Sequence, residues 1–228
     1  VGEPEDGRSK GVRYAGDAGW ASVYSFNGNK IITTSGGGMV ASHDEDVVAR
    51  ARKRSQQARE SAVWYEHAEL GYNYRMSNIV AAIGVGQLAF LEKIIQKKRL
   101  IFEWYRQRLG ALVGFMPEAA YGRCTRWLTV AEIRSKAPEF ESSKVGESEA
   151  GRPADAVMRV MACLEKENIE SRPVWKPMHL QPVFKEAKVY GGAVSARLFA
   201  CGVCLPSGTA LSESDVDRAC EQIVRALT

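Results

Sequence analysis

The stretch SFNGNKIITTSGGG, Ser25 to Gly38, places one lysine between small polar residues and a glycine triplet. An ordinary lysine amine has a pKa of about 10.4, so it is protonated at neutral pH and is a poor nucleophile. Covalent chemistry with a carbonyl compound needs the neutral amine, which burial or a neighbouring cation can produce. Ser25 offers a hydroxyl to a phosphate, and glycines let a ligand approach the backbone. Lys30 is therefore a candidate covalent lysine, and a solvated surface charge is the more common alternative.

Two short strands are expected on either side of this lysine. Residues 20–26, WASVYSF, alternate and are rich in β-forming residues, and residues 39–42 form a second apolar stretch after the glycines. A strand-turn-strand pattern brings Lys30 close to the edge of a sheet. A helix is predicted next, opening at His43 and Asp44 and running to about residue 59.

A basic cluster occupies this predicted helix. The cluster is expected to form a solvated helix face, and a role in binding an anionic substrate or a partner is the alternative. A net charge of +4 over 228 residues is too small to indicate a nucleic-acid binder, and no aromatic residues interleave the cluster. Its members are Arg50, Arg52, Lys53, Arg54 and Arg59.

The second half of the chain reads as another α/β lobe. A long helix is predicted from Ser77, a suitable N-cap, to about residue 109, and such a helix commonly links two lobes. The remaining expected elements are a strand at 126–133, a polar loop at 135–152, a helix at 153–167 with Pro153 in its first position, an extended segment at 171–177, and a last helix capped by Ser212 with Asp215 three residues on.

Composition places the chain among ordinary globular proteins, with 45% hydrophobic and 25% charged residues. We see no apolar run long enough to span a membrane and no signal peptide, so a soluble, cytoplasmic protein without membrane contact is expected. Cys201 and Cys204 form a single C-x-x-C pair among five cysteines. Because no second ligand pair has a suitable spacing, no metal site is expected, and the thiols are interpreted as buried or half-buried structural groups of a reducing compartment.

Several longer stretches together resemble one enzyme family. GDAGWASVYSFNGNKIITTSGGG (16–38) and GYNYRMSNIVAAIGVGQLAFLE (71–92) are similar to the DegT/DnrJ/EryC1/StrS family of sugar aminotransferases. The resemblance continues through RWLTV (126–130), RPVWKPMHLQPVF (172–184) and LPSGTALSESDVDRACEQI (205–223), so it covers nearly the whole chain. SFNGNKIITTSGGGM looks most like the branch that aminates UDP-4-keto-6-deoxy-N-acetylhexosamines for bacterial glycoconjugates.

The resemblance implies a fold and a reaction. The fold is the α/β, aspartate-aminotransferase type (fold type I), with residues 1–109 as part of the large domain that binds pyridoxal 5'-phosphate (PLP) and residues 110–228 as the small C-terminal domain. The reaction is transfer of an amino group, in most of the family from glutamate, to a keto group, expected at C4, of a nucleotide-linked deoxy sugar.

The resemblance also implies roles for four residues. Lys30 would hold PLP as a Schiff base and then shuttle the proton between the cofactor and the substrate carbon. Ser25 would bond the cofactor phosphate. Asn73 would reach the phosphate in the partner subunit's active site, which implies a homodimer with shared active sites. His179 would approach the nucleotide sugar. The dehydratase branch has histidine in place of this lysine, so Lys30 argues against dehydration.

Each of these assignments has a structural alternative. Ser25 could cap a strand end, Asn73 could be a turn residue, and His179 could be a packing histidine between lobes. Trp175, in the same stretch as His179, is expected in the core rather than stacked on a sugar.

Part of the family's pattern is missing from this chain. The phosphate-binding segment, the aromatic residue over the cofactor ring and the acid on the pyridine nitrogen lie upstream in the family, and residues 1–19 contain no matching block. We therefore expect the C-terminal portion of a longer enzyme, which binds PLP weakly by itself and tends to aggregate because sheet edges are exposed. The alternative function is a catalytically incompetent fragment that only dimerises or binds nucleotide sugar.

Overall fold

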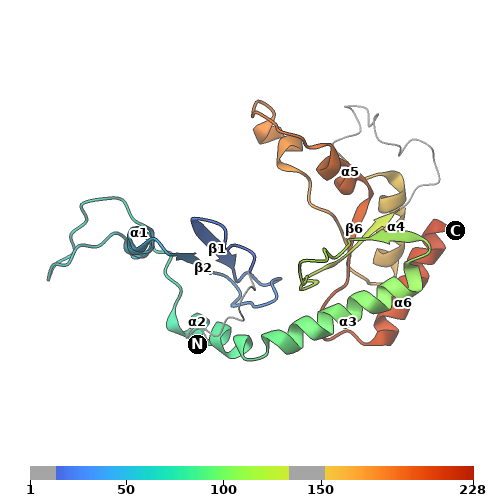
Figure 1. Cartoon of the computed structure of the whole chain (residues 1–228), viewed down its shortest axis with the longest axis horizontal. Coiled ribbons are helices and arrows are strands. Elements are labelled where there is room, and N and C mark those ends of the chain that lie inside the picture. Colours follow the sequence, from blue (N-terminus) through green and yellow to red (C-terminus); the bar gives the residue numbers. More distant parts are fainter. Residues whose placement is uncertain (1–13, 134–151) are drawn as a thin grey trace. The chain divides into compact units, whose positions relative to one another are not determined.

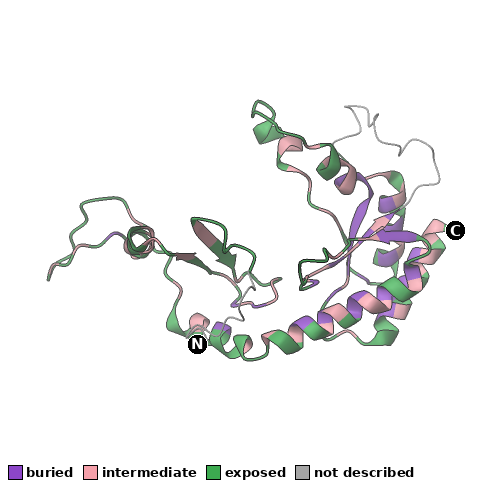
Figure 2. Ribbon diagram, in the orientation of Figure 1, coloured by how far each residue is buried: buried purple, intermediate pink, exposed green. Residues whose placement is uncertain are grey.

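The computed structural model describes residues 14–133 and 152–228. The chain divides into two compact units, Val1–Leu91 and Glu92–Thr228 (Figure 1). Most buried residues belong to the second unit, whereas exposed and half-buried residues dominate the first (Figure 2). The second unit therefore contains the hydrophobic core, and the first contains Lys30.

The first unit opens with an antiparallel hairpin, β1 (Ala21–Ser25) and β2 (Gly38–Ser42). Helix α1 (Glu45–Ser55) follows, and the Asp44 carboxylate caps it by accepting hydrogen bonds from backbone N–H groups of its first turn. Both strands and the helix start confirm the sequence prediction. The helix ends four residues earlier than predicted, because positive φ angles at Gln57 and Ala58 turn the chain.

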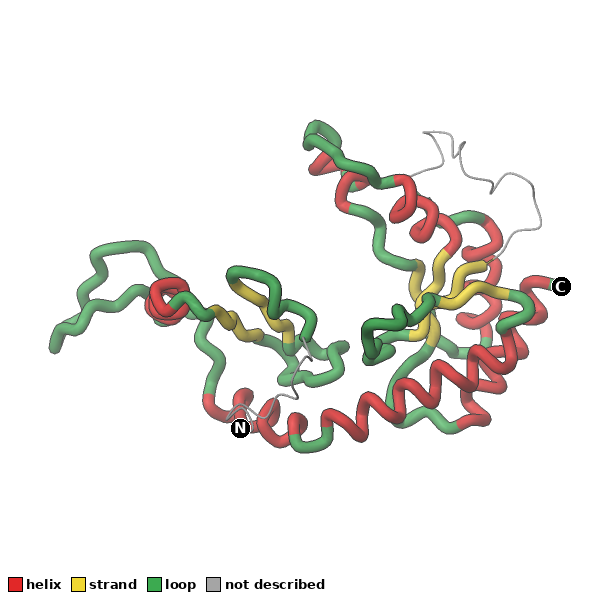
Figure 3. The backbone as a smooth tube through the Cα atoms, viewed as in Figure 1, coloured by secondary structure: helices red, strands yellow, loops and turns green. Residues whose placement is uncertain are grey.

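The long helix predicted from Ser77 is interrupted. The Ser77 hydroxyl caps α2 (Asn78–Leu88) as predicted, by accepting the backbone N–H of Val80. After two turn residues a separate helix, α3 (Leu91–Leu109), begins (Figure 3). The Phe90 N–H bonds to the Gln87 carbonyl, three residues back, so the regular helical ladder is broken at this point.

The compact units divide within the first turn of α3, between Leu91 and Glu92. The domain boundary expected from the sequence, between residues 109 and 110, stays a prediction. Helix α3 groups with the second unit because Ile101, Tyr105 and Leu109 belong to the hydrophobic core of that unit. A helix whose apolar face is buried in one core folds with that core.

The second unit is built on a four-stranded antiparallel sheet with the order β3-β4-β6-β5. These strands are Val113–Phe115 (β3), Thr129–Ile133 (β4), Gly202–Leu205 (β6) and Arg172–Pro173 (β5). The helices are α4 (Asp155–Lys166), α5 (Ala193–Cys201) and α6 (Glu213–Leu227), with short 3-10 turns at Met178–Leu180 (η2) and Pro182–Phe184 (η3).

The core of this unit lies between the sheet and the apolar faces of α3, α4 and α6. Thr129, Ala131 and Ile133 alternate with less buried residues along β4, as expected for a strand with one face in a core. Helix α6 has the predicted capping box, in which Ser212 and Asp215 bond reciprocally. The stripe Val216, Cys220, Ile223 is buried in the described structure.

One local prediction needs correction here, and another falls outside the described residues. Helix α4 begins at Asp155 with Ala154 as N-cap, so Pro153 is not its first residue; the Ala154 N–H bonds to the Ala200 carbonyl instead. The sequence predicts neither β3, β6 nor α5. The polar loop at 135–152 lies outside the described residues except for Arg152.

The cysteine interpretation is confirmed in its main point. All five cysteines are free, and Cys201, Cys204 and Cys220 are buried.

Within the described residues, no single helix is long and apolar enough to cross a membrane, although α2 and α3 taken together pass the same test of length and composition.

Candidate active site

The connection between β1 and β2 holds Lys30 in a compact, internally bonded loop. The Phe26 N–H donates to the Gly37 carbonyl at 3.0 Å, and the Thr34 N–H donates to the Phe26 carbonyl at 2.8 Å. A turn within the loop is closed by the Lys30 N–H, which donates to the Asn27 carbonyl at 3.0 Å. Lys30 is half-buried at this turn. The hairpin therefore fixes the backbone that carries the candidate amine.

Ser25 lies at the start of this connection and Lys30 lies within it. Ser25 is the last residue of β1 and is exposed, and its hydroxyl accepts the Asn27 N–H at 3.4 Å. A Cβ atom added at Gly28 or Gly36 would meet no described atom within 4 Å beyond the glycine and its chain neighbours. Open space therefore adjoins the loop that presents a hydroxyl and an amine.

Helix α2 supports the loop from one side. The Gln87 side-chain amide accepts the Thr33 N–H at 3.1 Å and donates to the Thr33 carbonyl at 2.6 Å. Gly84 faces the methyl group of Thr34, since a Cβ at Gly84 would lie 2.9 Å from that carbon. The absence of a side chain at Gly84 therefore permits the close approach of α2 to the loop. Sequence reasoning missed Gln87, because its partner is distant in the chain.

Asn73 lies on a different segment, which is bonded to the end of α1. The Tyr72 N–H donates to the Arg54 carbonyl at 2.7 Å, the Gln57 N–H donates to the Tyr72 carbonyl at 2.9 Å, and Asn73 forms an antiparallel bridge with Gln56. The Asn73 residue is exposed. Its backbone is thus held in place while its side chain lies at the surface of the first unit.

The basic cluster engages its own loop. Lys53 pairs with Glu60 at 2.8 Å and with Glu69 at 3.5 Å, and the hydrogen bond with Glu60 raises the pKa of Lys53. Arg54 also pairs with Glu69, at 3.2 Å. Arg59 lies over the Tyr65 ring at 4.2 Å. These contacts agree with the predicted surface face and add a second role, which is to order the residues that lead to Asn73.

His179 and Trp175 lie in the second unit. His179, in η2, is half-buried, and its ring packs on the Gly191–Gly192 turn at the start of α5; a Cβ at Gly192 would lie 3.0 Å from the imidazole. Trp175 is 59% exposed and stacks on Trp127, with ring centroids 5.7 Å apart. The expectation that Trp175 is a core residue is therefore wrong.

The composition of these surfaces limits the chemistry they can perform. Within residues 14–133 and 152–228, no group of three or more His, Cys, Asp or Glu side chains could hold a metal ion. The candidate residues Lys30, Ser25, Asn73 and His179 supply an amine, a hydroxyl, a carboxamide and an imidazole. Such a set suits covalent capture of a carbonyl compound and binding of a phosphate.

Comparison with known proteins decides the family. Residues 6–224 match the model of the DegT/DnrJ/EryC1/StrS aminotransferase family. The chain belongs to this family. Relatives within it include EpsN of Bacillus subtilis (strain 168), 44% identical over 93% of this chain and 52% of that protein, and a GDP-perosamine synthase of Caulobacter vibrioides, 31% identical over 90% and 52%.

Solved structures of DegT/DnrJ/EryC1/StrS aminotransferases show the same fold. Spr1654 from Streptococcus pneumoniae, in its PLP form, superposes with a TM-score of 0.75 at 20% identity, over 94% of this chain and 54% of that one. The fold is therefore the α/β, fold type I architecture of PLP-dependent sugar aminotransferases. The chain spans about half the length of the curated relatives it matches.

The residues present fit two parts of PLP, the cofactor of the DegT/DnrJ/EryC1/StrS family. PLP carries a carbonyl group that a lysine amine can hold and a phosphate that a hydroxyl can bond. Lys30 supplies the amine and Ser25 supplies the hydroxyl, and the open space at Gly28 and Gly36 adjoins the connection that carries them.

Proposed function

We propose that this chain carries the Schiff-base lysine and a phosphate-binding serine of an aminotransferase that uses PLP to aminate a keto sugar linked to a nucleotide. The observation that supports this most is the position of Lys30 and Ser25 on one hairpin connection, which α2 supports through Gln87. A lysine on a loop with ordered backbone can hold a cofactor in a single orientation, which a solvated lysine cannot do.

Each residue has one task in this proposal. Bound PLP supplies an electron sink for the reacting carbon. The Lys30 amine holds the cofactor until substrate arrives and then moves the proton at the carbon that gains the amino group. The Ser25 hydroxyl donates to the cofactor phosphate and so fixes the distance between that phosphate and Lys30. Transfer rather than dehydration follows from lysine, in place of histidine, at this position.

The substrate is a nucleotide-linked deoxy sugar with a keto group at C4, and glutamate is the amino donor. Relatives named GDP-perosamine synthase and UDP-4-amino-4,6-dideoxy-N-acetyl-beta-L-altrosamine transaminase support a nucleotide sugar. Similarity in SFNGNKIITTSGGGM to the UDP branch favours UDP as the carrier. The product would serve bacterial glycan or glycoconjugate synthesis. The five free cysteines fit a reducing compartment, so we place the enzyme in the cytoplasm.

Asn73 and His179 each have a proposed role as well. We place Asn73 at the cofactor phosphate of a second copy, so the active enzyme is a homodimer. Exposed apolar side chains on α2, among them Ile79 and Val85, support a partner surface nearby in the same unit, because a helix that is apolar all round is normally covered. His179 contacts the nucleotide sugar. Sedimentation of the chain at increasing concentration tests the dimer, and a monomer throughout would contradict it.

Reduction with borohydride tests the assignment of Lys30. The chain is incubated with PLP, reduced and digested, and the peptides are analysed by mass spectrometry. The expected result is a phosphopyridoxyl group on Lys30, lost in Lys30→Ala and retained in the matched surface variant Lys185→Ala. Reduction that fixes the group on another lysine, or on none, would refute the proposal.

A further inference from the structure

The two indole rings of Trp127 and Trp175 form an exposed aromatic platform in the second unit. Their centroids are 5.7 Å apart and their planes differ by 29°, so the rings are stacked. Trp175 nevertheless remains 59% exposed. Leaving a large apolar ring in water is unfavourable, and a rigid exposed aromatic is a common element of binding surfaces.

The backbone around Trp127 is fixed by a buried lysine. Lys98 of α3 is 8% exposed, and its Nζ atom donates to the Trp127 carbonyl at 3.0 Å and to the Ser207 carbonyl at 2.9 Å. Ser207 also accepts the Thr129 N–H at 2.8 Å, at the start of β4. Burial lowers the pKa of Lys98. The position of Trp127 is therefore set by buried polar contacts on both sides of it.

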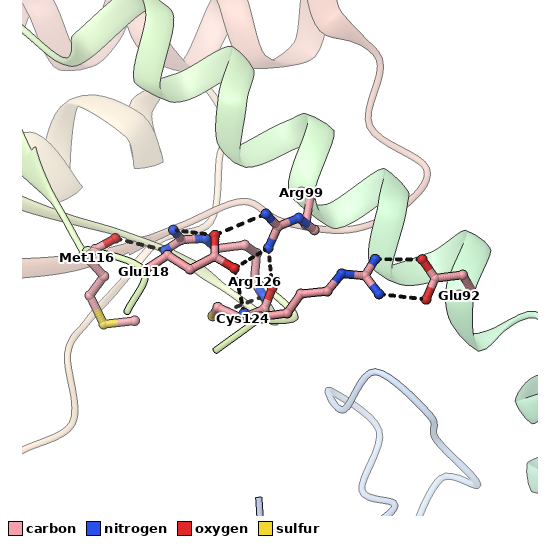
Figure 4. A network of polar contacts seen from close by, with 7 residues as sticks. Glu92, Arg99, Met116, Glu118, Cys124 and Arg126 are labelled. Atoms are coloured by element: carbon pink, nitrogen blue, oxygen red, sulfur yellow. Dashed lines mark hydrogen bonds and ion pairs between the residues drawn. The ribbon is translucent and has the colours of Figure 1, made fainter. Parts of the chain in front are cut away.

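A second network fixes the loop that leads into Trp127 (Figure 4). Glu118 accepts a two-pronged hydrogen bond from Arg99, at 2.7 and 3.0 Å, and the Cys124 N–H at 2.7 Å. Arg126, 6% exposed, donates to the Met116 carbonyl at 2.8 Å and lies over Phe102 at 3.8 Å. Such forked, partly buried pairs have little freedom.

The chain at Trp175 is restrained as well. Strand β5 ends two residues earlier and is paired with β6. The Val174 N–H donates to the Gly202 carbonyl at 3.0 Å, and Pro173 and Pro177 limit the backbone on either side of Trp175. Both indoles therefore stand on ordered backbone, so a flat ligand that stacks there would find the surface already formed.

We propose that the exposed face of Trp175, supported by Trp127, stacks on the nucleobase of the nucleotide that carries the sugar. This inference rests on the proposed function, because it takes the nucleotide-linked substrate from there. Every nucleobase is flat and presents a π face that can stack on an aromatic side chain, whereas a sugar ring is puckered. His179 lies four residues along the same segment, where the rest of a nucleotide sugar would extend.

Binding measurements with probes that contain or lack a base test the inference. Calorimetry on the full 228-residue chain uses uridine diphosphate and guanosine diphosphate as probes that contain a base. Inorganic pyrophosphate and hexose 1-phosphate lack one. Trp175→Ala should weaken binding of the nucleoside diphosphates about tenfold, and Trp175→Phe should restore most of it. Neither variant should change binding of the probes without a base.

The matched control is Trp64→Ala, which removes an indole of similar exposure, 65%, from the first unit. It should leave nucleotide binding unchanged. Thermal melts of each variant show that the fold is intact, and Trp175→Phe serves as the comparison if Trp175→Ala melts early.

Three outcomes would overturn the inference. The wild-type chain could fail to bind either nucleoside diphosphate, Trp175→Ala could bind them as tightly as wild type, or Trp175→Ala could weaken hexose 1-phosphate instead, which would indicate sugar stacking. The readout involves neither PLP nor amino transfer. If PLP is trapped on Lys30 but nucleoside diphosphates bind independently of Trp175, this inference alone is refuted. If PLP is not trapped on Lys30 but nucleoside diphosphate binding depends on Trp175, the proposed function alone is refuted.

Discussion

Gln87 bonds both backbone polar groups of Thr33, a residue 54 positions earlier in the chain. The side-chain amide thus takes the place of a neighbouring strand for one residue of the loop that carries Lys30. Among the described residues, the internal turns of this loop, the contact of Thr34 with Met76 and the Gln87 side chain order it, so Gln87 helps to set the geometry of the candidate site.

Replacing this glutamine should loosen the loop. Gln87→Leu removes two part-buried hydrogen bonds, which should lower the free energy of unfolding by about 1–3 kcal/mol. The Thr33 amide should exchange with solvent faster, as measured by NMR. The control is Gln96→Leu, which removes an amide bonded to Glu92 on the exposed surface of α3. Unchanged exchange at Thr33 in Gln87→Leu would show that the loop is ordered without this contact.

Adding one carbon at Gly71 should displace the segment that carries Asn73. A Cβ there would lie 2.2 Å from the Ala58 nitrogen and from the Gln57 carbonyl carbon, and backbone atoms cannot give way cheaply. Gly71→Ala should destabilise the first unit by about 1–3 kcal/mol and expose the Tyr72 amide to exchange. Gly28→Ala, which meets open space, is the control. Equal melting temperatures for both variants would contradict the geometry.

The Glu118 network should make stability depend on pH in the acid range. The hydrogen bond from Arg99, and to a smaller extent that from the Cys124 N–H, lowers the pKa of Glu118 from 4.5 to about 2. A folded-state pKa below the unfolded value stabilises the protein above about pH 4.5, and this contribution disappears as pH falls toward 2.

Urea unfolding at several pH values measures this contribution. The stability difference between wild type and Glu118→Gln should be largest near neutral pH and should shrink between about pH 4.5 and pH 2. The control variant Glu186→Gln changes a carboxylate that is 88% exposed, so it should leave the curve unchanged. A difference between wild type and Glu118→Gln that stays constant down to pH 2 would refute the assignment.

The five thiols should differ in reactivity. Burial raises the pKa of Cys201 to about 11 and of Cys220 to about 12, and it also raises that of Cys204. Because the thiolate is the reactive form, iodoacetamide at pH 8 should label the half-buried Cys124 and Cys163 first. Peptide mass spectrometry over time measures the order. Early labelling of Cys201 and Cys204 would contradict their burial.

Local signals in the sequence were sufficient for several helix starts and for the hairpin that carries Lys30. Helix starts at Asp44, Ser77 and Ser212 depend on a side chain and backbone groups within three residues of it, so type and spacing alone indicate them. The Lys30 connection is similarly local, because its two strands pair across a short loop. The family resemblance added the expected roles of Ser25, Asn73 and His179.

Only the tertiary structure decided which residues distant in the sequence contact one another. Lys98 bonds carbonyls 29 and 109 positions away, and Trp175 stacks on Trp127 rather than entering the core. The membership of α3 in the second unit depends on the core that buries its side chains. Caps and turns are fixed by neighbours in sequence and can be found there, whereas long-range hydrogen bonds and ring contacts exist only once the chain has folded.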